Sequence, residues 1–259
     1  MLKKTLIVSF LLATATVVTL LVFGNKGSAP EKPNLVNTQA QPSEPTTTSS
    51  KTPEFDKKMY SLTDPTSIWF IANKQFALPA TYVPSDLTVP VVPLRLNAGE
   101  EQMKIRKVAE ADLLALFEAG KQAGLQLEFG SGYRSAAYQN TLYSGYVASM
   151  GQAEADKSSA RPGHSEHQTG LALDFTRVDG SCHLQECFGQ LLEGTWLAEN
   201  AHLYGFILRY PENKQSVTGY IYEPWHYRYV GRSLAAEFKK QNAATLEEFF
   251  SLEAAPDYL

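Results

Sequence analysis

Cysteine is almost absent from this sequence, which has two in 259 residues, Cys182 and Cys187. Neither lies near the N-terminus, which excludes a lipoprotein anchor there. A block of basic residues is also missing, because the formal net charge of −4 is spread along the chain. Proteins that bind nucleic acid usually present a basic face, so we expect no nucleic-acid partner. The 44% of hydrophobic residues suffice for one sizeable core, and nothing indicates a second.

Charges are absent from residues 5–23, an apolar run that follows Lys3 and Lys4. As a helix this run would be about 28 Å long, close to the ~30 Å hydrocarbon core of a bilayer. The lysines favour a cytoplasmic N-terminus, with the rest of the chain outside. Small residues at 27–29 would suit a signal peptidase, but Pro30 is a poor residue directly after a cleavage site. We therefore expect residues 1–29 to be a membrane anchor, with a cleaved signal peptide as the alternative.

Large apolar side chains are rare in residues 30–58, which carry five prolines and the run Thr46-Thr47-Thr48-Ser49-Ser50. Such a segment cannot bury enough surface to offset the entropy lost on ordering. It predicts a flexible linker. The folded domain is then expected to span residues 59–259.

The most informative stretch is residues 161–175, where a turn rich in polar residues leads into an apolar run. If residues 171–175 form a strand, their side chains alternate between its two faces. Asp174 then lies on the face opposite Leu171, Leu173 and Phe175. The preceding turn can bring His167 back to the same point.

A second segment, residues 219–230, offers His226 with Glu223 three positions before it. Two imidazoles and one carboxylate are a common ligand set for catalytic zinc, which leaves one position open for water. Each residue alone is more often structural, but the joint pattern predicts one zinc ion per chain, held by His167, Asp174 and His226. Glu223 is then the candidate general base for the water.

The pattern Ser165-Glu166-His167-x-x-Gly170-x-Ala172-x-Asp174, followed by Glu223-Pro224-Trp225-His226, resembles the VanY/LdcB type of zinc D,D- or L,D-carboxypeptidase. The similarity also covers residues 131–135 with Gln139, and residues 73–87, so it runs from about residue 64 to the C-terminus. It implies a zinc enzyme that removes the C-terminal D-alanine from peptidoglycan stem peptides, outside the cytoplasm, at the cell wall or in the periplasm.

Two other functions stay open at this point. One is an L,D-carboxypeptidase that trims tetrapeptide stems to tripeptides with the same ligand set. The other is a peptidoglycan-binding or scaffolding protein that keeps the fold without turnover, although such a protein has no physical need for a base at Glu223.

Arg134 is expected at a turn between a strand over 125–129 and a helix over 136–147. Arginine grips a carboxylate with a two-pronged fork that lysine cannot reproduce. By resemblance we assign Arg134 to the substrate's terminal carboxylate or to the scissile carbonyl, with a structural salt bridge as the alternative. The resemblance also assigns Gln139 and Ser165 to the substrate, although Ser165 could equally cap the turn.

Cys182 and Cys187 enclose four residues. Outside the membrane such a pair is expected to form a disulfide, which would stiffen a loop beside the site. A metal site built from Cys182, His183 and Cys187 lacks a convincing fourth ligand.

The remaining patterns predict one α+β domain, with an antiparallel sheet that carries zinc on one face and helices on the other. By resemblance this is the Hedgehog/DD-peptidase type of fold. We expect a helix over 104–123 ended by Gly124, a short strand near 68–72, and two helices with Ser135 and Thr195 as their N-caps. Asn73 and Lys74 could contact the substrate, but we interpret them as surface residues that make hydrogen bonds. We take a monomer as the expectation, although the sequence does not determine the oligomeric state.

Overall fold

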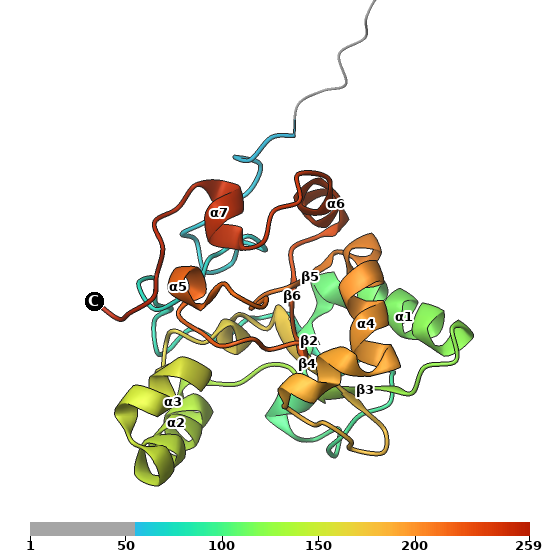
Figure 1. The fold of residues 1–259 in the computed structure, drawn as a ribbon, viewed down its shortest axis with the longest axis horizontal. Helices are drawn as coiled ribbons and strands as arrows, with labels where there is room; N and C mark the ends of the chain where they lie inside the picture. The colour runs from blue at the N-terminus through green and yellow to red at the C-terminus, as the bar shows by residue number, and fades with distance from the viewer. Residues whose placement is uncertain (1–54) are drawn as a thin grey trace, which may run out of the picture. The chain divides into compact units, whose positions relative to one another are not determined.

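The computed structural model describes residues 55–259, and its centre is a four-stranded antiparallel sheet with strand order β3-β4-β6-β5 (Figure 1). A separate antiparallel pair joins β1 and β2. The strands are β1 Leu87–Thr88, β2 Ile105–Arg106, β3 Leu127–Ser131, β4 Ala172–Arg177, β5 Phe206–Leu208 and β6 His226–Tyr229. The expected α+β class with an antiparallel sheet is therefore confirmed.

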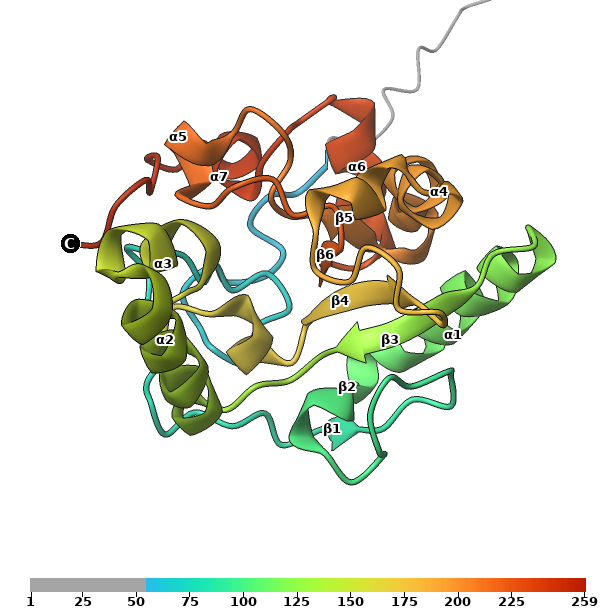
Figure 2. The ribbon, with the colours of Figure 1, turned by 60° about the horizontal axis from the view of Figure 1, so that its bottom comes forward.

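Seven α-helices are present in the described part of the chain, and α2 and α3 lie side by side (Figure 2). They are α1 Lys107–Gln122, α2 Ala136–Met150, α3 Gln152–Ser158, α4 Leu192–Asn200, α5 Gln215–Thr218, α6 Arg232–Lys240 and α7 Leu246–Phe250. Within residues 55–259, no helix has both the length and the apolar character needed to cross a bilayer. The expected anchor, residues 1–29, lies outside the described residues, as does nearly all of the expected linker.

One face of the sheet is apolar. Leu173 and Phe175 of β4 are fully buried in the main core, together with Leu113 of α1 and Leu197 of α4. The Phe175 ring lies 5.7 Å from the ring of Phe117 in α1. Each such side chain contributes about 1.5–3 kcal/mol by leaving water. The alternation expected for β4 thus places helices on one face and leaves the other for the polar residues.

The segment expected to contain a strand near 68–72 is buried but forms a succession of turns. Its backbone bonds to nearby turn residues and to side chains instead of to a neighbouring strand. The Arg228 guanidinium donates to the carbonyls of Ile68 (3.0 Å) and Phe70 (2.8 Å). The Phe55 ring stacks on Trp69 in this region, so packing already begins at residue 55.

Helix ends follow the expected signals in two of three places. Gly124 follows α1 with φ +80°, a conformation that favours glycine, and the Ser135 side chain caps α2 by accepting from the Tyr138 amide. Thr195 is not a cap, because α4 begins at Leu192. The Thr195 hydroxyl instead donates to the Leu191 carbonyl, inside the helix.

Candidate metal centre and active site

The pairing of β4 with β6 brings two of the expected ligands together. Asp174 and His226 are direct partners across this antiparallel ladder, so their side chains share the face opposite the core. His167 comes from the short 3-10 helix Glu166–Thr169. That helix ends at Gly170, whose φ of +66° lets the chain turn directly into β4.

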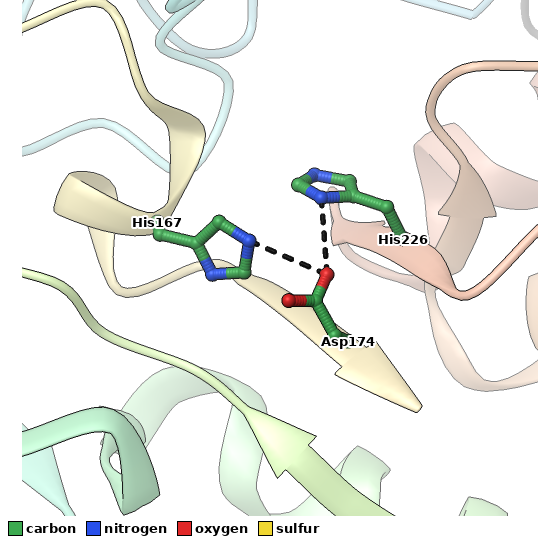
Figure 3. Close-up of side chains that lie close together, drawn as sticks. All are labelled: His167, Asp174 and His226. Atoms are coloured by element: carbon green, nitrogen blue, oxygen red, sulfur yellow. Dashed lines mark ion pairs between the residues drawn. The ribbon is translucent and has the colours of Figure 1, made fainter. Parts of the chain in front are cut away.

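The three side chains converge on one point (Figure 3). Asp174 Oδ1 lies 3.4 Å from His167 Nε2 and 3.3 Å from His226 Nδ1. One ligand atom from each residue falls within 4.8 Å of the others, and all three side chains are buried. The described residues thus contain a two-histidine, one-carboxylate cluster, and that donor set is typical of catalytic zinc.

The hydrogen bonds around this cluster leave its inner atoms free for a cation. His167 Nδ1 lies 2.6 Å from the Gly132 carbonyl, to which it donates, so the lone pair of Nε2 faces inward. His167 Nε2 and Asp174 Oδ1 are buried and have no hydrogen-bond partner among the described residues. Buried polar atoms without partners are costly, and a divalent metal would satisfy both. The residues therefore fit zinc.

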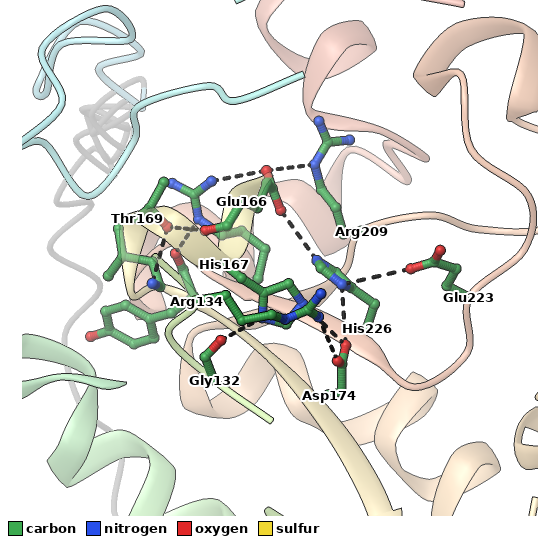
Figure 4. A network of polar contacts seen from close by, with 12 residues as sticks. Gly132, Arg134, Glu166, His167, Thr169, Asp174, Arg209, Glu223 and His226 are labelled. Carbon is green, nitrogen blue, oxygen red and sulfur yellow. Dashed lines mark hydrogen bonds and ion pairs between the residues drawn. The ribbon is translucent and has the colours of Figure 1, made fainter. Parts of the chain in front are cut away.

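Glu166, for which the sequence indicates no role, contacts the other side of His226. Its Oε2 lies 3.5 Å from His226 Nε2, the ring nitrogen that faces away from Asp174 (Figure 4). Its Oε1 accepts from Arg209 (2.8 Å) and Arg228 (2.9 Å). Burial alone would raise the pKa of Glu166, but the two guanidinium groups hold that pKa well below its usual range. A permanent carboxylate therefore orients this imidazole.

The two histidines differ in their electrostatic surroundings. Burial, assisted by the positive charge of Arg134, lowers the pKa of His167 to about 4. Burial also acts to lower the pKa of His226, but contacts with Asp174 and Glu166 outweigh it and raise that pKa to about 9. A metal at this site would have to displace a proton from His226.

Glu223 lies in the loop before β6 and is followed directly by Pro224. Its Oε2 lies 3.7 Å from His226 Nδ1, on the cleft side. Burial raises the pKa of Glu223 to about 7, although the nearby His226 opposes that rise. The carboxyl group therefore lies close to the metal ligands and, in the metal-free site, has a pKa near neutral pH. A group that accepts and returns a proton needs both properties.

Arg134 reaches the same point from the turn after β3. Its Nη2 donates to Asp174 Oδ2 (3.0 Å) and its Nη1 to Gln139 Oε1 (3.3 Å). The Ser131 hydroxyl also donates to Asp174 Oδ2 (2.9 Å), a contact that the sequence does not predict. Arg134 thus makes the salt bridge considered as its alternative role, while its Nε remains without a partner among the described residues.

A cleft of about 400 Å3 contains the expected site residues. Its wall includes Ser165 and Gln139, and the Gln139 side chain is fixed by donating to the Ala160 carbonyl (2.8 Å). Further lining residues come from the 182–187 loop, which the Cys182–Cys187 disulfide closes in this structure.

Asn73 and Lys74 do not line the cleft, and the expectation that they lie on the surface is wrong. Asn73 Nδ2 donates to buried Glu247 (3.1 Å), and Lys74 Nζ donates to the Pro256 carbonyl (2.9 Å). Their polar groups have partners within the protein, which a short sequence motif does not reveal.

The fold and this site define a metallohydrolase, with a cluster suited to zinc and a free acid in one cleft. Residues 102–232 match the VanY family, described as D-alanyl-D-alanine carboxypeptidase. The chain belongs to this family of enzymes, and so the non-catalytic alternative loses its support.

Individual relatives agree with this assignment. The carboxypeptidase candidate YodJ of Bacillus subtilis is 43% identical over 190 residues, which are 73% of this chain and 69% of that protein. The structure of the LdcB LD-carboxypeptidase has a TM-score of 0.68 at 43% identity and covers 72% of this chain and 87% of its own. A VanY D,D-pentapeptidase variant in complex with Zn(II) has a TM-score of 0.57 at 33% identity, over 70% and 97% of the two chains.

Proposed function

We propose that this chain is a zinc-dependent carboxypeptidase that releases the C-terminal D-alanine of peptidoglycan stem peptides. The observation that carries the proposal is the convergence of His167, Asp174 and His226 beside Glu223 in one cleft. The Zn(II) complex of a VanY relative supports zinc as the metal. The family description supports D-alanine as the residue released.

Zinc, when held by His167, Asp174 and His226, would supply a Lewis acid that activates water and polarises the scissile carbonyl. Glu223 accepts the proton of the attacking water and donates it to the amino group that leaves. In the metal-free site burial raises the pKa of Glu223 to about 7, so this carboxyl group binds a proton more readily than an ordinary glutamate and can accept the proton of water. Beside bound zinc that pKa would be lower, which favours return of the proton to the leaving amino group.

Arg134 provides the positive charge that a free carboxy-terminus requires. Its Nη2 donates to Asp174 and its Nη1 to Gln139, and each of these nitrogens carries a second N–H. Because the guanidinium lines the cleft, it can donate to the terminal carboxylate of the substrate or to the charge that develops on the scissile oxygen. Gln139 holds the guanidinium in place. Ser165, buried at the cleft wall, is the proposed further contact to the peptide.

Two substrate ends remain candidates. The family description favours stems that end in D-Ala-D-Ala. The likeness to LdcB, at 43% identity against 33% for the zinc-bound VanY, favours tetrapeptide stems, in which an L-centre precedes the D-alanine. Both reactions release D-alanine and need the same ligands, so only the pocket beside the scissile bond distinguishes them.

The test is to incubate the purified protein with pentapeptide and tetrapeptide stems and to follow D-alanine release by mass spectrometry. We expect release from at least one stem, its loss on treatment with a chelator, and its return when zinc is added. Stoichiometric zinc without release from either stem would refute the proposal and favour a binding protein.

We also propose that the enzyme is monomeric and acts outside the cytoplasm, held by a membrane anchor in residues 1–29 and a flexible linker in 30–58. The charge-free run at 5–23 supports the anchor, and the cell-wall substrates of the relatives support the location. Protease treatment of intact cells, with fractionation of the membranes, tests this arrangement.

A further inference from the structure

Residues 254–259, which follow α7 and lie outside the region matched to the family, pack back onto the domain. Ala255 is fully buried, and its amide donates to the Val217 carbonyl (2.8 Å). Lys74, itself buried, donates to the Pro256 carbonyl (2.9 Å). Two backbone positions are therefore fixed just before Tyr258.

Tyr258 contacts the turn at residues 161–167, which carries the first metal ligand. Its hydroxyl accepts a hydrogen bond from the Arg161 amide (2.9 Å). Its ring lies 4.1 Å from the Arg161 guanidinium carbon and meets the His164 ring edge-on at 5.0 Å. One side chain thus braces the turn at two points, three and six residues before His167.

A second line of contacts leads from Tyr258 to another ligand. The hydroxyls of Tyr258 and Tyr220 share a hydrogen bond of 3.2 Å. The Tyr220 ring packs against Tyr210 at 4.8 Å, and Tyr210 packs against the His226 imidazole at 4.8 Å. Lys74 Nζ lies over both the Tyr220 and Tyr258 rings, at 5.1 and 5.3 Å, where its charge is attracted to their faces.

The three ligands are not equally fixed by secondary structure. Asp174 and His226 face each other across a strand ladder, whereas His167 stands on a four-residue 3-10 helix after a turn. A metal site tolerates only about 0.5 Å of error in its ligands. The turn therefore requires support from elsewhere in the fold, and Tyr258 contacts it directly.

We propose that Tyr258 is a positioning residue, which fixes the 161–167 turn and thereby the His167 imidazole relative to the other two ligands. The expected fall in turnover number rests on the proposed function, whereas the expected loosening of the turn does not. The expected signature is a local loosening of the turn and a lower turnover number when Tyr258 is lost, with substrate affinity little changed.

The test uses the full chain and three variants. Tyr258→Ala removes the ring and hydroxyl, and Tyr258→Phe removes the hydroxyl alone. The matched control is Tyr204→Ala, because Tyr204 is also half-buried, stacks on another aromatic ring, Trp196, and has an arginine guanidinium at 5.5 Å. It lies outside the cleft lining. Hydrogen exchange of peptides covering 161–170 is measured in the metal-free protein, and kcat and KM in the zinc-loaded protein.

For Tyr258→Ala we expect exchange in the turn to rise at least about tenfold and kcat to fall by about 10- to 100-fold, since small misplacements of catalytic groups have effects of this size. Tyr258→Phe should raise exchange mainly at the Arg161 amide. If Tyr258→Ala does not fold, this variant alone tests whether Tyr258 fixes the turn. Tyr204→Ala leaves both readouts at the wild-type level.

Unchanged exchange in the turn, equal loosening by Tyr204→Ala, or a loosened turn with normal kcat would each overturn the proposal. If the wild-type chain released no D-alanine at all, the proposed function would fail. The exchange comparison would still decide whether Tyr258 fixes the turn.

Discussion

The two faces of β4 are equally buried but differ completely in chemistry. Leu173 and Phe175 pack into an apolar core, where the loss of contact with water stabilises the fold. Asp174 and Thr176 on the opposite face are as inaccessible, yet polar. A buried carboxylate is tolerated only with partners, and Asp174 has Ser131 and Arg134. One face is thus built for stability, and the other for a reaction.

The reaction face should respond in rate. Glu223→Ala is expected to lower kcat by about 10²- to 10⁴-fold, the usual contribution of a general acid-base group, while zinc content stays stoichiometric because the ligands are intact. It should not lower the unfolding midpoint, since a buried acid whose pKa is raised to about 7 does not stabilise the fold when ionised. Steady-state kinetics and elemental analysis check this. Near-normal hydrolysis would show that another group moves the proton.

The core face should respond in stability. Phe175→Ala removes a fully buried ring that contacts Phe117 and Tyr227. We expect a loss of about 3–5 kcal/mol in the free energy of unfolding, because the ring leaves a cavity behind. Urea denaturation monitored by circular dichroism gives the value. At urea concentrations where the variant is still folded, it should bind zinc as the wild type does. A Phe175→Ala variant with wild-type stability but without zinc would contradict the assignment of stability to one face and metal binding to the other.

A third substitution tests whether a buried ionic cluster contributes as much to the free energy of unfolding as the apolar core does. Glu166→Gln removes the charge that faces Arg209 and Arg228, both of them fully buried. Breaking such a buried ionic cluster costs about 3–5 kcal/mol, because the guanidinium groups lose their counter-charge. Denaturation of the metal-free proteins at pH 7 measures the difference from wild type.

The pH dependence separates this cost from that of Phe175→Ala. The pKa of Glu166 lies well below its ordinary 4.5 in the folded state, so its stabilising effect is complete above pH 4.5 and is lost as the pH falls further. The wild-type advantage over Glu166→Gln should therefore shrink on acidification. The cost of Phe175→Ala should hardly change as the pH falls below 4.5, so parallel curves for the two variants in that range would count against the ionic cluster.

The sequence was sufficient for the parts of the site that local rules decide. Strand alternation correctly predicted that Asp174 and Phe175 lie on opposite faces of β4. The buried cluster around Glu166 followed no such rule. Its charges come from four distant segments, the last of them Glu247 in α7, and a single sequence does not pair them.

The missed elements have the same origin. Residues 68–72 have the apolar composition of a strand, but the Arg228 side chain satisfies their carbonyls, so no neighbouring strand is needed. Lys74 was interpreted as a surface residue because lysine is rarely buried. Its cover, the Pro256 carbonyl and two tyrosine rings, comes from residues up to 184 positions away. Tertiary contacts of this kind overrule local composition.

The smallest expected effect lies at the cleft rim, where neither core packing nor the ligand set is involved. Replacing both Cys182 and Cys187 with serine opens a loop of only a few residues, so the unfolded chain gains little entropy and the cost should be about 2 kcal/mol. Because His183 and Leu184 of this loop line the cleft, we expect KM to rise a few-fold while kcat and zinc content stay near wild type. Chemical denaturation and kinetics on the same stem peptide measure the two effects. A large fall in kcat with normal KM would mean that the loop acts on the ligands themselves and not on the substrate beside them.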